Sequence, residues 1–202
     1  MPIATPVTPP PPSPAEGSAD QRLVMVNVPW SAYEAQLQLR GDAPVPRIAY
    51  LDGAMELMSP SRDHERLKSY LGRLVEAYAL ERGIDLSPYG AWTLRQAPRS
   101  SGLEPDECYL IGDQQRERPD LAIEVVWTHG GIDKLEIYRR LGVPEVWVWQ
   151  DGTLQVFVLR GDAYQSGERS EQLPGIDLTV LVSFLDRPTA MQAVRAYRET
   201  LR

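Results

Sequence analysis

The sequence has little cysteine and little histidine, and it contains no long apolar run. Its single cysteine, Cys108, excludes an internal disulfide and a metal site built from several cysteines. Two histidines, His64 and His129, leave little for a histidine-rich zinc site, so any bound metal is expected to be a hard ion held by oxygen. No apolar run reaches the length of about 18 residues needed to span a bilayer. The N-terminus also lacks the basic and apolar regions of a secretory signal, and we expect a cytoplasmic protein with no membrane partner.

An excess of positive charge is also missing. The formal net charge is -7 and the pI is near 4.9, which argues against binding nucleic acid through bulk charge. That objection is incomplete, because carboxylates that bind a divalent metal are partly neutralised in use. With 202 residues, 43% of them hydrophobic, the composition predicts one globular domain over residues 21–202. Residues 1–20 contain seven prolines by position 14 and are predicted to be a disordered tail.

Hydrophobic periodicity and turn residues predict alternating strands and helices over the rest of the chain. The strongest signals are the hairpin turn at Asp52-Gly53 and a long amphipathic helix that Gly83 can end. The predicted helices are Ser31 to Gly41, Ser61 to Arg82, Ile132 to Leu141 and Pro188 to Leu201, and the predicted strands are Arg47–Leu51, Ala54–Met58, Tyr89–Arg95, a short strand ending at Ile111, Leu121–Trp127, Glu145–Trp149, Leu154–Leu159 and the Tyr164 region.

A carboxylate interrupts the most apolar of these strands. Residues 121–127 are apolar at both parities except at Glu124, which is typical of a strand covered on both faces of a sheet. An unpaired carboxylate buried there costs several kcal/mol, on the order of the penalty for an unmatched buried charge. We therefore expect a cation, a metal ion or a proton to meet Glu124.

The next predicted helix supplies a candidate cation. Stepping about 100° per residue from Ile132 places Lys134 in the middle of the apolar face, while the other charged residues of the helix lie opposite. Lys134 is thus the one charge that points towards the sheet carrying Glu124. The pattern is compatible with a structural ion pair or a snorkelling lysine, and also with a functional site.

A third charged residue lies just before the preceding strand, where three carboxylates precede an apolar run. Alone, this segment would be an acidic turn, but Asp106 is predicted to lie beside the strand that carries Glu124. Two carboxylates on neighbouring strands can hold Mg²⁺ or Mn²⁺, with the main-chain carbonyl of Val125 as a further ligand. Such a metal can acidify a water and shield a phosphodiester, while Lys134 positions or deprotonates that water.

These residues resemble a known family. Pro105-Asp106 followed by Glu124-Val125-Val126 is similar to the PD-(D/E)XK nuclease superfamily, with Val126 where a lysine is usual. The resemblance is closer to the Uma-two family of restriction-endonuclease-like proteins, over roughly residues 28 to 185. The matching set comprises Asp52-Gly53, Met58-Ser59-Pro60-Ser61, His64, Asp106, Asp120 to Val125, Lys134 with Tyr138, and Gly142 to Trp147.

The resemblance implies a restriction-endonuclease-like α/β fold, with a mixed central sheet flanked by helices and β-hairpin extensions. It implies a metal-dependent DNA endonuclease in which Asp106 and Glu124 bind the metal and the catalytic lysine has moved to Lys134. A homodimer is expected from it, because cutting two strands commonly uses two sites. Supporting candidates are Asp120 on the same strand, Glu56 in the hairpin and His64 in the first turn of the long helix, where pattern alone favours a capping and solvated residue.

Two other functions are compatible with the residues. A non-catalytic binding or regulatory module could keep the fold and present its acidic surface to a protein partner, in which case Glu124 and Lys134 are a structural pair. A glycosidase with two carboxylates would work without metal, at a carboxyl separation of about 5–9.5 Å, but it gives the inward lysine no clear role.

Overall fold

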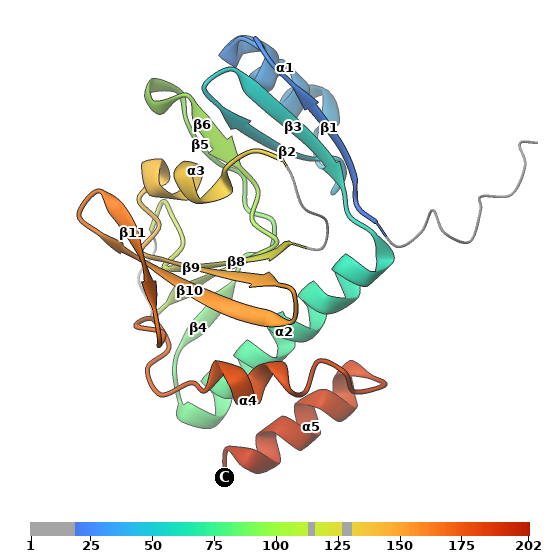
Figure 1. Cartoon of the computed structure of the whole chain (residues 1–202), viewed down its shortest axis with the longest axis vertical. Helices are drawn as coiled ribbons and strands as arrows, with labels where there is room; N and C mark the ends of the chain where they lie inside the picture. Colours follow the sequence, from blue (N-terminus) through green and yellow to red (C-terminus); the bar gives the residue numbers. More distant parts are fainter. Residues whose placement is uncertain (1–18, 113–115, 127–130) are drawn as a thin grey trace, which may run out of the picture.

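The computed structural model describes residues 19–112, 116–126 and 131–202, which form a mixed α/β fold (Figure 1). Within these residues there are two β-sheets and five α-helices, which confirms the predicted fold class. The predicted tail lies outside the described residues as far as position 18, and so do Trp127 and His129. Over the described ranges, no helix is long and apolar enough to cross a membrane.

A six-stranded mixed sheet forms the centre of the molecule. Strands β8 and β9 run parallel, and α3 (Lys134–Leu141) follows β8 as the crossover that parallel neighbours require. The other neighbouring strands in this sheet pair antiparallel. Its strand order is β11 (Ala163–Gly167), β10 (Thr153–Arg160), β9 (Glu145–Gln150), β8 (Leu121–Val126), β7 (Glu107–Ile111) and β4 (Leu86–Pro88).

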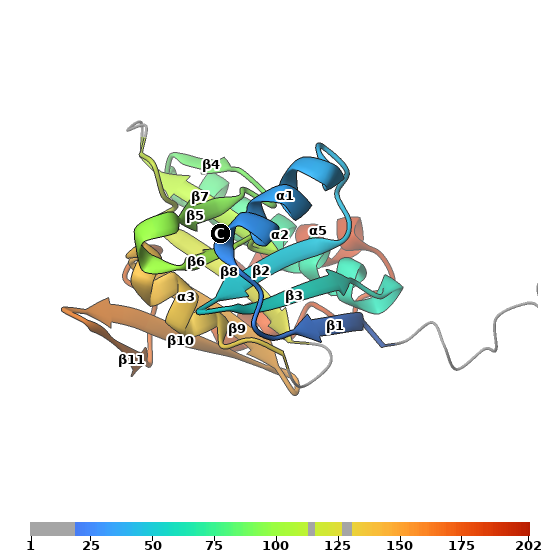
Figure 2. The same cartoon turned by 90° about the horizontal axis from the view of Figure 1, so that it is seen from above.

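A second sheet lies across α3 from the first (Figures 1 and 2). It is antiparallel throughout its described pairings, and α1 (Trp30–Arg40) packs on it through aromatic side chains. The predicted hairpin is confirmed, because Asp52 and Gly53 both have positive φ and join two paired strands. Its strand order is β1 (Gln21–Met25), β3 (Ala54–Ser59), β2 (Arg47–Leu51), β6 (Ser101–Leu103) and β5 (Leu94–Gln96).

The opposite face of the six-stranded sheet is covered by helices. The long helix α2 (Arg62–Arg82) contacts that face, and α4 (Leu178–Val182) and α5 (Ala190–Thr200) share its hydrophobic core (Figure 1). Ser61 caps α2 and Gly83 ends it in the left-handed conformation, as predicted. Strand β8 is therefore enclosed by α2 on one face and α3 on the other, which accounts for its apolar sequence.

Several predicted elements differ from the structure. The strand predicted at Tyr89–Arg95 is wrong, because β4 ends at Pro88, β5 begins at Leu94, and Gly90 turns the chain at positive φ between them. Helix α1 begins at Trp30 without a side-chain cap, so Ser31 does not start it. A short 3₁₀ helix, η1 (Ala97–Arg99), connects β5 to β6. Neither β1 nor α4 was predicted from the pattern.

Candidate active site

Glu124 is a buried charge on the face of β8 that points towards α3. Its side chain is 3% exposed. Side chains alternate along the strand, so Ile123 and Val125 pack in the core with α2, while Ala122 lies on the same face as Glu124, towards α3. The expected partners are present. The Nζ of Lys134 lies 2.5 Å from Oε2 of Glu124, and the Tyr138 hydroxyl donates to Oε1. Both carboxylate oxygens are thus paired with groups on one helix.

Helix α3 aims these two partners at the sheet. Asp133 caps its first turn by accepting from the N–H of Glu136, and Gly142 ends it in the left-handed conformation. Because residues four apart lie on one face of a helix, Lys134 and Tyr138 reach the same carboxylate. Burial first, and then the adjacent Glu124, raise the pKa of Tyr138 well above its usual value, so its hydroxyl stays a donor.

A cavity of about 250 Å³ opens beside this pair, bounded by both sheets. Glu124, Val125 and Lys134 line it from the six-stranded sheet and α3, while Arg22 and Glu56 line it from β1 and β3. Oε2 of Glu56 accepts a hydrogen bond of 3.2 Å from the N–H of Ile132, which ties β3 to the residues ahead of α3. The structure therefore brings the hairpin candidate Glu56 to the same cavity as the predicted catalytic pair.

Asp106 lies next to Glu124 across the β7–β8 ladder. Asp106 immediately precedes β7, whose first residue, Glu107, pairs with Ile123, the neighbour of Glu124. Oδ2 of Asp106 accepts a 2.7 Å hydrogen bond from the N–H of Val125, so this carboxylate rests against the backbone that follows Glu124. Asp106 thus contacts the segment that carries Glu124, and the joint role of the two carboxylates stays a prediction.

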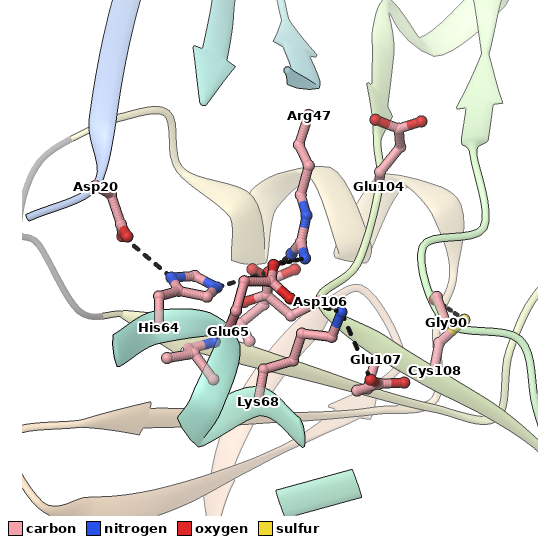
Figure 3. A network of polar contacts seen from close by, with 12 residues as sticks. Asp20, Arg47, His64, Glu65, Lys68, Gly90, Glu104, Asp106, Glu107 and Cys108 are labelled. Carbon is pink, nitrogen blue, oxygen red and sulfur yellow. Dashed lines mark hydrogen bonds and ion pairs between the residues drawn. The ribbon is translucent and has the colours of Figure 1, made fainter. Parts of the chain in front are cut away.

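The other oxygen of Asp106 belongs to a buried charge network (Figure 3). Oδ1 pairs with Nη1 of Arg47 and lies 3.1 Å from Nε2 of His64. The Arg47 guanidinium also bonds Oε1 of Glu65 at 2.7 Å. Asp106 and His64 are fully buried and Arg47 nearly so, with 7% of its side chain exposed. Charges in such a place persist because they are paired and hydrogen-bonded.

His64 is not the solvated residue that its helix position suggested. Its ring is fully buried, with Nδ1 3.1 Å from Oδ2 of Asp20 and Nε2 facing Asp106. Asp20 also accepts a 2.8 Å bond from the N–H of Ser61, the cap of α2. Burial acts to raise the pKa of Asp20, but its bonds with His64 and Ser61 outweigh that effect and lower it. The prediction failed because the partner of His64, Asp20, was assigned to the disordered tail.

Asp120 does not join these groups. It stands just before β8, at the end of the strand away from Glu124. Oδ2 accepts a 2.9 Å bond from the N–H of Ile111, and Oδ1 pairs with Arg116. These contacts hold the connection between β7 and β8 together, so Asp120 has a structural role there.

The acidic residues around Asp106 have structural partners as well. Glu104 accepts from Arg40, from the N–H of Ile48 and from the Thr93 hydroxyl, and so joins strands of the five-stranded sheet to α1. Glu107 lies 3.8 Å from Lys68. Among the described contacts of Glu104, Asp106 and Glu107, only that of Asp106 reaches the segment that carries Glu124.

The donor set suits a hydrated divalent ion. Mg²⁺ binds proteins through one or two carboxylates and keeps several waters, and the chain offers Glu124 on β8 and Asp106, which is bonded to the N–H of the next residue, Val125. In the part of the chain that the structure describes, no group of three or more Asp, Glu, His or Cys side chains could form a full cage. The residues therefore fit a metal that completes its coordination with water.

Sequence reasoning missed Arg47 and Asp20. Arg47 begins a strand whose pattern marks it only as the edge of a hairpin, and Asp20 ends the proline-rich segment. The predicted tail included Asp20, yet this residue is 7% exposed and bonded to α2. An available signal was the run from Ile48 to Leu51, which is apolar at both parities and leaves Arg47 as the one charge on the strand.

The chain matches one family model and several solved structures. The family model described as "Uma2: Putative restriction endonuclease" matches residues 30–186 of the chain. Among solved structures, the chain is similar to the crystal structure of "a putative nuclease belonging to DUF820" from Anabaena variabilis. That match has 11% sequence identity and a TM-score of 0.46, and it covers 82% of this chain and 98% of the other. No curated protein matches the sequence.

Proposed function

Because the chain belongs to the Uma2 family, we propose that it is a Mg²⁺- or Mn²⁺-dependent endonuclease that hydrolyses phosphodiester bonds in DNA. The observation that carries the proposal is the contact of Lys134 with Glu124 on the wall of a cavity, with Asp106 bonded to the N–H of Val125, the residue after Glu124. A buried carboxylate pair beside a movable cation is the donor set that phosphodiester hydrolysis requires.

Asp106 and Glu124 hold the metal in this proposal, with the Val125 carbonyl as a further ligand. Bound there, Mg²⁺ supplies Lewis acidity, a more acidic water and a countercharge for the phosphodiester. Lys134 holds or accepts a proton at Nζ and stabilises charge on the phosphoryl oxygens. Tyr138 fixes the Glu124 carboxylate through Oε1, which leaves Oε2 as the oxygen that exchanges partners.

The walls of the cavity support the same reaction. Val146 and Val148 of β9 and Phe157 of β10 line it together with the charged groups. Apolar walls lower the local dielectric and strengthen the interaction of Lys134 with an anionic phosphate. In this proposal Glu56 is a supporting group on the facing wall of the cavity.

Metal titration tests this proposal directly. We expect isothermal titration calorimetry to show Mg²⁺ or Mn²⁺ binding to the wild type, and loss of binding in Asp106→Ala and Glu124→Ala. A supercoiled plasmid should be nicked by the wild type only when metal is present. Folding of each variant is checked by circular dichroism, and Asp63→Ala, at an exposed position on α2, is the matched control. A folded wild type that binds neither ion contradicts the proposal.

The predicted homodimer belongs to the same proposal. Two active sites in one particle would cut both strands of a duplex in a single encounter. Light scattering coupled to size-exclusion chromatography should give twice the chain mass of 22.7 kDa. A monomer that nicks a plasmid without linearising it would contradict the dimer and leave the hydrolytic site intact.

A non-catalytic module is the second candidate, and one observation favours it. Each candidate metal ligand already has a protein cation, since Arg47 pairs with Asp106 and Lys134 pairs with Glu124. Internal pairs of this kind can be structural only. If that is so, Lys134→Met will leave the protein's biological effect unchanged. The nuclease instead requires that this variant lose turnover while it remains folded.

A further inference from the structure

We infer that Asp20 and His64 are positioning residues for the Asp106 carboxylate, and that they hold it in the orientation that receives the metal. The inference rests on the proposed nuclease function, and it assigns roles to two residues that contact neither metal nor substrate in that proposal. Asp20 orients the His64 ring, and the ring orients Asp106 (Figure 3).

The geometry is a continuous chain of three side chains. Oδ2 of Asp20 lies 3.1 Å from Nδ1 of His64, and Nε2 of the same ring lies 3.1 Å from Oδ1 of Asp106. All three side chains are 0% exposed, so water does not compete for these positions. The hydrogen bond at Nδ1 fixes the orientation of the ring, so that Nε2 faces Asp106.

Asp106 is consequently held from two sides. The N–H of Val125 fixes Oδ2, while His64 and Arg47 fix Oδ1. These contacts come from β8, α2 and β2, so the plane of the carboxylate depends on three separate elements. Groups that bind a carboxylate ligand from behind in this manner typically change metal affinity or activity by about 10–100-fold when they are removed.

Asp20 has a second contact that must be separated from this role. Its Oδ1 accepts from the N–H of Ser61, and the Ser61 hydroxyl in turn accepts 3.2 Å from the N–H of His64. Loss of Asp20 could therefore loosen the start of α2 without any effect on Asp106. Asp20→Asn keeps an amide oxygen for the Ser61 N–H and removes the charge that faces His64, so this substitution isolates the positioning role.

The same N-terminal segment reaches the cavity. Arg22, two residues after Asp20, lines the cavity next to Glu56, and it lies 3.7 Å from Oδ2 of Asp20. The beginning of β1 thus contacts the buried side of the site through Asp20 and its open side through Arg22. Asp20 is in this way placed to couple the packing of β1 to the arrangement of the metal ligands.

The test compares five substitutions in the full chain: two that disturb the positioning, two controls and one rescue. Asp20→Asn and His64→Asn should weaken Mg²⁺ binding by about 10–100-fold in calorimetry and lower kcat at subsaturating metal, with little change in the KM for DNA. Ser61→Ala removes only the helix cap, so it should lower Tm while Mg²⁺ affinity stays at the wild-type value. Asp63→Asn, exposed in the same first turn, should change neither. Asp20→Glu, which restores a carboxylate, should recover part of the lost affinity.

The outcomes distinguish this inference from the proposed function. If the wild type binds Mg²⁺ and cuts DNA while Asp20→Asn does both equally well, the positioning role is overturned and the nuclease stands. If affinity falls in proportion to Tm, and falls equally in Ser61→Ala, the role is structural and the inference is again overturned. If the wild type binds no metal and cuts no DNA, both proposals fail together.

Discussion

The two carboxylates of the candidate site have opposite surroundings. Asp106 lies in a network that is closed to solvent and is neutralised by Arg47, a planar cation that remains charged and bonds two carboxylates at once. Glu124 lies on a cavity wall and is neutralised by Lys134, a single-point cation on a flexible stem with 20% of its side chain exposed. The difference teaches that one half of the site is built to stay fixed, whereas the other half can exchange its partner.

Lys134→Met tests the exchangeable half and has the largest expected effect. Removing a group that transfers or positions a proton should lower kcat by about 10²–10⁴-fold. The loss of stability should be modest, because the cavity lets water reach Glu124 and the Tyr138 hydroxyl remains bonded to it. Plasmid nicking measures the first effect and urea unfolding the second. Arg195→Met, exposed on α5, is the control. Wild-type turnover in Lys134→Met would contradict the nuclease.

Arg47→Met makes the same change in the fixed half. It leaves Asp106 buried without its cation, and we expect the free energy of unfolding to fall by about 3–5 kcal/mol. Urea denaturation followed by tryptophan fluorescence measures the difference from wild type. The comparison between the two halves breaks down if Arg47→Met and Lys134→Met destabilise the protein equally, since burial would then not distinguish the two pairs.

Tyr138→Phe sharpens the comparison within the Glu124 half. The hydroxyl bonds a carboxylate, and hydrogen bonds to charged groups are worth about 1.5–3 kcal/mol. Tyr164→Phe is matched to it, because the Tyr164 hydroxyl donates to the neutral carbonyl of Val143 at 2.7 Å and should contribute about 0.5–1.5 kcal/mol. Chemical denaturation of both variants gives the two values. A larger loss in Tyr164→Phe would argue against an ionised Glu124.

Ion pairs on the outer face of α3 provide the smallest effect. Hydrogen bonds from Arg139 and Arg140 lower the pKa of Glu136 to about 2. A lowered pKa contributes stability that is present above the unfolded value near 4.5 and is lost as the pH falls from there towards 2. Because Glu136 is open to solvent, we expect no more than about 0.5 kcal/mol. Urea unfolding of wild type and Glu136→Gln at pH 6 and pH 3 measures it. A difference as large as that of Arg47→Met would contradict the importance of burial.

The pairing of Glu124 with Lys134 was predictable from the sequence, whereas the partners of Asp106 were not. Lys134 and Glu124 are ten positions apart, and the period of one helix and the parity of one strand were enough to point them at each other. The partners of Asp106 come from residues 20, 47 and 64, and no local period reports which of these distant segments meet. Sequence patterns show which way a side chain points on its own element, but not which other element stands opposite.

The fold shows the same division. Long elements with strong periods, such as α2 and β10, were predicted near their true bounds. The three-residue strands β4 and β5 were not, since their propensities are weak and the sheets impose their pairing. Strand β1 was missed because its largely exposed residues show no regular alternation of polar and apolar side chains. It is an edge strand that pairs with β3.

The cavity takes its walls from both sheets, with Arg22 and Glu56 on one side and Glu124 on the other. Neither sheet alone contains a complete set of walls, so a chain in which only one sheet has formed cannot hold a phosphodiester in place. During refolding, hydrolysis should appear together with docking of the two sheets and not before it. Under the proposed function, a newly made or half-folded molecule would therefore not cut DNA before the two sheets have docked.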